Sequence, residues 1–196
     1  ANCGAATSQH RRLCPCSRAV AGASITDSTG GIAATMKSGN SGDLPQRTAT
    51  GVVMVGTGVA ASTSNKGGFL ELALGAETLG GPMTIEIVGK WNAFNAYSRL
   101  FECSNGEFSN NIIVNNGILD FPNQPTLGWT TLFEPETNPV WKGVHSSSTN
   151  TLTIGVRYHI VVTVSDTTMI IYINGVEDEK TTSNGAEPNS ITRSQC

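Results

Sequence analysis

The sequence predicts an all-β protein built as an antiparallel β-sandwich, and three observations support this. The chain has 22 Gly among 196 residues and only 14% charged residues, and its richness in Thr, Ser, Asn and Gly is unfavourable for helices. Apolar and polar residues alternate in several short segments, as in strands with one buried face. Turn signals separate these segments at intervals of roughly 8–12 residues, a spacing typical of sandwiches.

The charge balance excludes several classes of partner. The formal net charge is −3 and the isoelectric point is near 5.6, so we expect no nucleic-acid partner and no general attraction to an anionic membrane. No stretch approaches the ~18 apolar residues that a membrane-spanning helix needs. No secretory signal is visible, which fits a mature chain, an internal portion or a protein that is not secreted.

The first 49 residues show little hydrophobic periodicity. They are rich in Gly, Ala, Ser and Thr and contain three of the five cysteines. We interpret residues 1–49 as an extended, cysteine-containing N-terminal arm, and a loosely ordered linker is an equally good interpretation. The domain that follows is expected over residues 50–196.

Strand patterns begin at residue 51. Leu70, Leu72 and Leu74 share one face of a predicted strand, and the Asn174-Gly175 pair is typical of a two-residue hairpin turn. Prolines make residues 122–140 an irregular connection around one short strand. The predicted strands cover residues 51–59, 68–74, 83–88, 98–103, 111–114, 118–121, 129–133, 156–164, 169–173 and 176–180.

Several of these segments together resemble a known family. They are residues 80–87 (GGPMTIEI), 90–92 (KWN), 98–106 (SRLFECSNG), 110–114 (NNIIV), 155–164 (GVRYHIVVTV) and 169–176 (MIIYINGV). In order and spacing they are similar to a laminin-G-like domain of the concanavalin A-like lectin/glucanase superfamily, over about residues 50–196. The resemblance implies a jelly-roll sandwich. In that family a segment like residues 190–196 leads into further strands, so the resemblance implies an incomplete C-terminal end or a missing strand supplied by a neighbour.

The five cysteines favour disulfides over zinc. Cys14 and Cys16 are separated by one residue and no second close pair exists, whereas zinc sites usually combine two pairs. Disulfides indicate an oxidising, extracellular compartment. The odd number leaves one cysteine free or paired outside this chain, and the partners stay open for Cys3, Cys14, Cys16, Cys103 and Cys196.

The sequence contains no recognisable catalytic pattern. The resemblance implies that a glucanase would carry Glu-x-Asp-x-x-Glu on one strand, but Glu86 is alone on its strand and residues 177–179 are adjacent acids that alternate between faces. His159 lies in an apolar strand, where a hydrogen-bonded structural histidine is favoured. Pairing with Cys103 stays open, although the apolar position of this cysteine favours an inert thiol or a disulfide.

Two binding hypotheses remain. Calcium, the one cofactor considered, accepts flexible oxygen ligands, which Asn105, Glu107, Asn110 and Asp120 could provide; ordinary turn formation is the alternative. A glycan could stack on exposed tryptophans beside asparagine amides, and burial in the core is the alternative for these tryptophans. The glycan candidates are Trp129, Trp141, Asn123 and Asn138.

The sequence therefore predicts a non-catalytic extracellular module for recognition or structural assembly. It would belong to a cell-surface, matrix or filament protein and would bind glycans or other protein chains, including copies of itself. The alternative function is a glycan hydrolase or lyase of the same superfamily.

Overall fold

The computed structural model confirms an all-β protein with several antiparallel sheets. It describes residues 24–26, 32–38, 44–49, 51–54, 67–75, 77–92, 98–106, 109–116, 127–133, 140–145 and 152–196, and these contain strands and turns but no helix.

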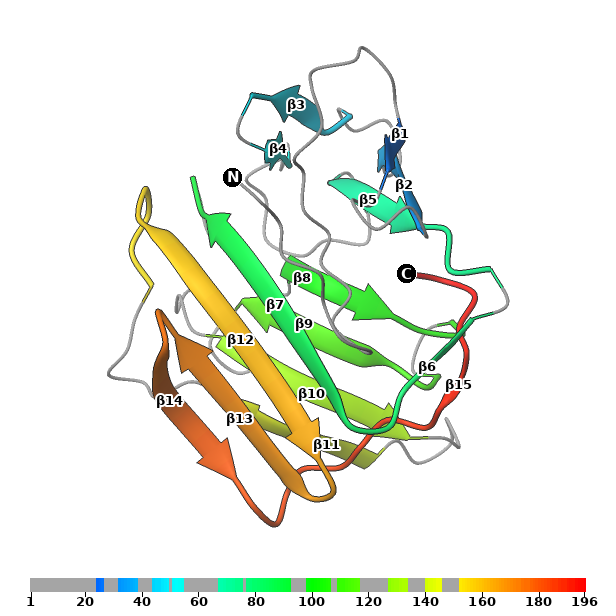
Figure 1. The fold of residues 1–196 in the computed structure, drawn as a ribbon, viewed down its shortest axis with the longest axis vertical. Coiled ribbons are helices and arrows are strands. Elements are labelled where there is room, and N and C mark those ends of the chain that lie inside the picture. The colour runs from blue at the N-terminus through cyan, green and yellow to red at the C-terminus, as the bar shows by residue number, and fades with distance from the viewer. Residues whose placement is uncertain are drawn as a thin grey trace, which may run out of the picture.

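Two four-stranded antiparallel sheets form the body of the protein. The sheet that we call the front sheet has the order β14 (Val176–Thr181), β13 (Thr168–Ile173), β12 (Arg157–Ser165) and β7 (Met83–Lys90). The back sheet has the order β11 (Val140–His145), β10 (Leu127–Phe133), β9 (Ile112–Asn116) and β8 (Ser98–Cys103). Figure 1 shows the front sheet lying over the back sheet.

The core lies between the two sheets, as in a sandwich. The two-residue period of the strands puts every second residue on the inner face. The front sheet contributes buried branched and sulfur-containing side chains, and the back sheet contributes a second set; together they include Ile112, Val114, Val144, Ile160, Val162, Val164, Met169 and Ile171. Trp91, which follows β7, belongs to this cluster and is 9% exposed.

The outer faces of the two sheets differ. On the back sheet, Ile113 faces away from its buried neighbours Ile112 and Val114, yet it is itself only 2% exposed. On the front sheet, Val88 points outward and is 52% exposed. The outer face of the front sheet is thus the more open of the two at these positions.

Three smaller sheets complete the described strands. They are β1 (Ser24–Thr26), β2 (Ala33–Ser38) and β5 (Gly68–Leu72); β3 (Gln46–Thr48) and β4 (Gly51–Val53); and β6 (Thr78–Leu79) with β15 (Ile191–Thr192). Because Ala34 of β2 pairs with Leu72 of β5, strand pairing crosses the expected boundary at residue 50. The segment expected as an arm therefore contributes strands to the folded protein.

Candidate functional site

The last residues of the chain run across one end of the sandwich, and we call residues 188–196 the C-terminal strap. Its Ile191 pairs with Leu79 of β6, just before β7 of the front sheet. Further along, Gln195 forms a two-way backbone bridge with Ser104, which directly follows β8 of the back sheet. The strap therefore joins the two layers through backbone hydrogen bonds (Figure 1).

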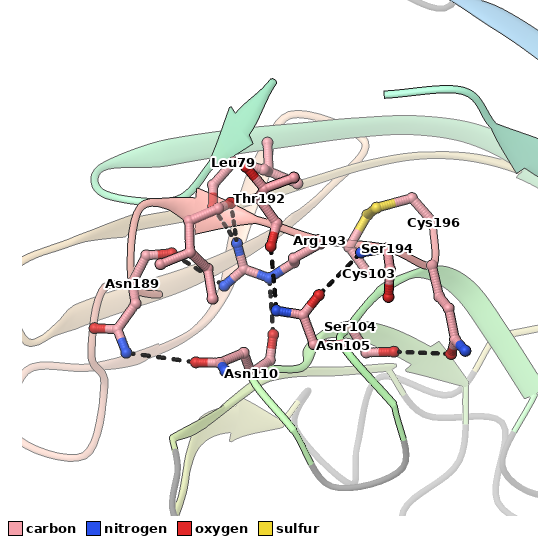
Figure 2. Close-up of a disulfide and its surroundings, with 12 residues drawn as sticks. Leu79, Cys103, Ser104, Asn105, Asn110, Asn189, Thr192, Arg193, Ser194 and Cys196 are labelled. Atoms are coloured by element: carbon pink, nitrogen blue, oxygen red, sulfur yellow. Dashed lines mark hydrogen bonds between the residues drawn. A yellow bond between two sulfur atoms is a disulfide. The ribbon is translucent and has the colours of Figure 1, made fainter. Parts of the chain in front are cut away.

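A disulfide fixes the end of the strap. Cys103, at the end of β8 and fully buried, is bonded to Cys196, with the two Cα atoms 4.2 Å apart (Figure 2). This bond confirms the expectation of a disulfide and gives Cys103 a partner that the sequence left open. Because its sulfur is in a disulfide, Cys103 has no free thiol for a pair with His159. Cys3, Cys14 and Cys16 lie outside the described residues.

A buried arginine anchors the middle of the strap. Arg193 is 3% exposed, and its guanidinium donates hydrogen bonds to the backbone carbonyls of Asn110 at 2.8 Å, Asn189 at 3.1 Å and Leu79 (Figure 2). Burial lowers the pKa of Arg193 to about 10, so the group stays protonated at neutral pH. Its planar fork of donors suits carbonyls that converge from three directions.

Two of the four calcium candidates lie at the strap. The Asn105 side chain donates to the carbonyl of Thr192 at 3.1 Å and accepts from the Ser194 N–H at 2.9 Å (Figure 2). The backbone carbonyl of Asn110 accepts from Arg193, which places a positive charge beside it. Glu107 and Asp120 lie outside the described residues. Calcium binding here stays a prediction, and the structure shows that both asparagines have a structural role.

The glycan candidates are placed only in part. Trp129 of β10 stands in register between Val114 of β9 and Val144 of β11, and Trp141 of β11 pairs with Leu132. The side chains of both tryptophans, together with Asn123 and Asn138, lie outside what the structure describes.

The outer face of the front sheet presents a more complete set of side chains. Across four strands, the pairing register lines up Glu86, Val161, Tyr172 and Glu177 in one row. In the next row, His159 pairs with Val88, and its Nε2 lies 2.8 Å from Oε1 of Glu86. Both side chains of this pair are about two-fifths exposed, at 41% for His159 and 39% for Glu86. We call these outward residues of β7, β12, β13 and β14 the front face.

The spacing of the acids on the front face bears on catalysis. Glu86 and Glu177 stand at opposite ends of a four-strand row. Three inter-strand steps of about 4.8 Å separate their backbones by about 14 Å. Both side chains would have to extend toward each other along the row to bring their carboxyl groups to the about 5 to 9.5 Å that glycosidases use. Glu86 is instead in hydrogen-bond contact with His159, so this histidine is hydrogen-bonded, as expected.

A cavity opens at the end of the front sheet. It has a volume of about 370 Å³ and lies beside the Asn174-Gly175 turn that joins β13 to β14. Aliphatic and aromatic groups form one part of its lining and two acids form another; the lining residues are Leu152, Tyr158, Ile173, Asn174, Val176, Glu177 and Asp178.

Sequence reasoning missed three of these features. Arg193 carried no signal, because one arginine in a polar segment usually indicates a solvated side chain. The Glu86–His159 contact depends on the register between β7 and β12, which lie more than 60 residues apart in sequence. The cavity depends on how the turn after Ile173 closes over Tyr158, so no local pattern could have indicated it.

Within the described ranges, no three His, Cys, Asp or Glu side chains gather into a group able to hold a metal ion. The same part of the chain contains no helix long and apolar enough to span a membrane. No family model, curated protein or solved structure matches this chain.

Proposed function

We propose that this chain is a non-catalytic recognition or assembly module of an extracellular protein, and that it uses the front face as its contact surface. The observation that carries the proposal is the contrast between the two outer faces. Ile113 on the back sheet is covered, whereas the front face exposes Val88, Glu86 and His159 on adjacent strands.

The composition of the front face suits binding. It combines an aromatic side chain with a hydroxyl (Tyr172), an aliphatic one (Val161), and a carboxylate–imidazole pair on rigid strands. Such mixtures of apolar bodies and polar ends are typical of surfaces that contact glycans or proteins. Because strands hold these groups at fixed spacing, little conformational entropy is lost on binding.

The proposal includes a jelly-roll arrangement of the laminin-G-like type. Two features support it: β7 crosses to pair with β12, far along the chain, and the two four-stranded sheets enclose one core. An extracellular location is part of the same proposal. It is supported by the Cys103–Cys196 bond, since disulfides persist in oxidising compartments.

The test is a binding screen with the disulfide-intact protein on arrays of glycans and of extracellular matrix proteins. Substituting Tyr172→Ala and Val161→Glu together should abolish the specific signals. The control is Glu71→Ala. Glu71 lies on β5, outside the front sheet, and its side chain is 51% exposed. This substitution should leave the binding signals unchanged. Signals that survive the double substitution would show that another surface binds.

Hydrolysis is assayed in the same experiment. We expect no new reducing ends from any glycan that the protein binds, because three inter-strand steps of about 4.8 Å separate the backbones of the two acids in the front-face row. Turnover that disappears in Glu86→Gln would overturn the non-catalytic proposal.

A further inference from the structure

We propose that the cavity at the β13–β14 turn accepts the cationic side chain of a lysine or arginine from a partner protein. The inference rests on the proposed function, because it assigns a partner class to a protein that we propose to be a recognition module. It concerns the cavity at the end of β14, which shares only Glu177 with the front face, and the experiment below has arms that separate the two.

The wall of the cavity is an extension of the core. Tyr158 precedes the buried Ile160 by two residues, and Ile173 follows the buried Ile171 by two, so both continue the inner face of the front sheet. Leu152, which also lines the cavity, is 4% exposed. The wall is held firmly, because the Tyr158 ring packs edge-on against Trp91 and its hydroxyl accepts from the Thr153 N–H at 2.9 Å.

The acids give the cavity its charge. Glu177 and Asp178 line it, and no lysine, arginine or histidine is among the lining residues. A carboxylate beside an apolar wall attracts a cation more strongly than one in open water, since the local dielectric is lower. The ligand that matches both parts has an aliphatic stem and a positive end, as lysine and arginine side chains do.

The size and surroundings favour a side chain from a protein over a free metabolite. A volume of about 370 Å³ is at the small end of ligand sites. Val176 lines the cavity and is 69% exposed, and Ile154 and Val156, which lie in sequence between the lining residues Leu152 and Tyr158, are 54% and 43% exposed. In a partner protein, the residues on either side of the inserted lysine or arginine would contact these apolar side chains. A free amine has no such flanking residues.

The partner segment is not expected to add a strand to β14. The register between β13 and β14 shifts at Ile171/Tyr172, which is a bulge, and Glu179 pairs with the inner-face residue Ile171. Bulges and inward-pointing charges are devices that prevent edge pairing. Recognition at this end therefore depends on the inserted side chain.

The experiment uses fluorescein-labelled short peptides with one central lysine, arginine, acetyl-lysine or glutamate between leucines, and measures anisotropy with the full chain. The lysine and arginine peptides should bind, and acetylation should weaken binding about tenfold, as expected for loss of one charge-assisted hydrogen bond. The double variant Glu177→Gln/Asp178→Asn should cause a similar loss, about tenfold or more. Val176→Lys, at an exposed position, should abolish binding by placing a positive charge at the opening.

The matched control is Glu179→Gln, which removes the same charge one residue further along and does not line the cavity. It should leave affinity within about twofold of the starting protein, since screening by salt weakens more distant charges. The inference is overturned if acetyl-lysine binds as well as lysine, if the control loses as much affinity as the double variant, or if no cationic peptide binds.

Two further arms separate this inference from the proposed function. If butylamine competes as strongly per molecule as the lysine peptide, a free amine is the ligand and the partner assignment is wrong. If array partners are lost with the front-face double variant but are unaffected by the cavity variants, and no peptide binds, then the cavity inference fails while the proposed function stands.

Discussion

The backbone N–H of Leu72 donates a hydrogen bond to the carbonyl oxygen of Cys196, at 2.7 Å. Leu72 ends β5, and the sulfur of Cys196 is bonded to Cys103 at the end of β8. One residue of the C-terminal strap therefore joins the β1–β2–β5 sheet to the back sheet. Because the same strap also pairs with β6 before the front sheet, its attachment should control the stability of the whole sandwich.

Removing the disulfide should destabilise the protein. The bond closes a loop with a sequence separation of 93 residues, and a cross-link over a loop of this length restricts the unfolded chain strongly. We expect Cys103→Ala/Cys196→Ala to lower the free energy of unfolding by about 2–5 kcal/mol, measured as a shift in the urea midpoint. Dithiothreitol should give a comparable loss in the unsubstituted protein.

The double variant also provides the control for this prediction. Dithiothreitol should leave its urea midpoint unchanged. A further decrease would mean that the stabilising bond involves cysteines other than Cys103 and Cys196.

Replacing Arg193 should loosen the strap. Arg193→Met keeps most of the volume but leaves the carbonyls of Leu79, Asn110 and Asn189 without their donor. Each buried acceptor left unsatisfied costs about 1–3 kcal/mol, so we expect a total loss of about 3 kcal/mol or more by urea denaturation. Arg157→Met, at an exposed position of β12, is the control and should change stability by less than about 0.5 kcal/mol.

The contribution of Arg193 to the stability of the fold depends on pH in a defined direction. Burial lowers the pKa of Arg193 in the folded state to about 10, well below its ordinary value. The unfolded chain therefore holds the proton more tightly, and the contribution of this residue to stability increases only as the pH rises above about 10. Between pH 6 and 9 the difference in stability between Arg193 and Arg193→Met should stay constant. A difference that changes with pH in this window would contradict burial as the cause.

Asn105→Asp separates a structural role from calcium binding. An aspartate would be a better calcium ligand, but it cannot donate to the carbonyl of Thr192 as the Asn105 amide does. If the amide holds the strap, the variant should lose about 0.5–1.5 kcal/mol in the absence of calcium, because the bond is exposed to water. Calcium at millimolar concentration should leave the melting temperature of the unsubstituted protein unchanged, because Arg193 places a positive charge beside Asn110. An increase in the melting temperature with calcium would support the metal site instead.

The sequence predicted the central strands well, because their signal is local. Alternating apolar residues specified β7, β12 and β13, and the Asn174-Gly175 turn specified the hairpin to β14. Here Asn174 and Gly175 both have positive φ, at 53° and 83°, as such a turn requires.

Other strands carried weaker signals or none. Ala33–Ser38 is β2, but its polar composition resembles a linker, and it becomes a strand because β5 pairs with it. Val140–His145 is β11, although prolines nearby favoured an irregular connection. In both cases pairing with a neighbouring strand, which is a tertiary contact, overrides a poor local preference.

The site was predicted less completely than the fold, because it too depends on tertiary contacts. Cys103 could be identified as a candidate for a disulfide, but its partner Cys196 required the path of the strap. Asn105 and Asn110 were identified as polar groups on a turn, and their actual contacts with Thr192 and Arg193 join segments more than 80 residues apart. Contacts of this kind follow from topology and leave no periodic pattern in the sequence.

Gly80 provides the most direct test of how closely the strap approaches the sheets. Its φ is +150°, and a Cβ at this position would lie 2.2 Å from the carbonyl oxygen of Asn189. Because this oxygen belongs to the backbone of the strap, which Gly81 and Arg193 also hold in place, it cannot move aside cheaply. We expect Gly80→Ala to cost about 2 kcal/mol or more, as overpacking costs typically 1–3 kcal/mol and the backbone strain adds to this.

Gly89 in β7 is the matched control, since it lies in the same part of the chain and a Cβ there meets nothing within 4 Å. Gly89→Ala should be neutral or stabilise the protein by up to about 1 kcal/mol, because alanine restricts the unfolded chain more than glycine does. Both variants are compared by their urea midpoints. Equal shifts of the urea midpoint in the two variants would mean that the strap does not lie against Gly80 in solution. A decrease in Gly80→Ala alone would support the close approach of the strap to Gly80.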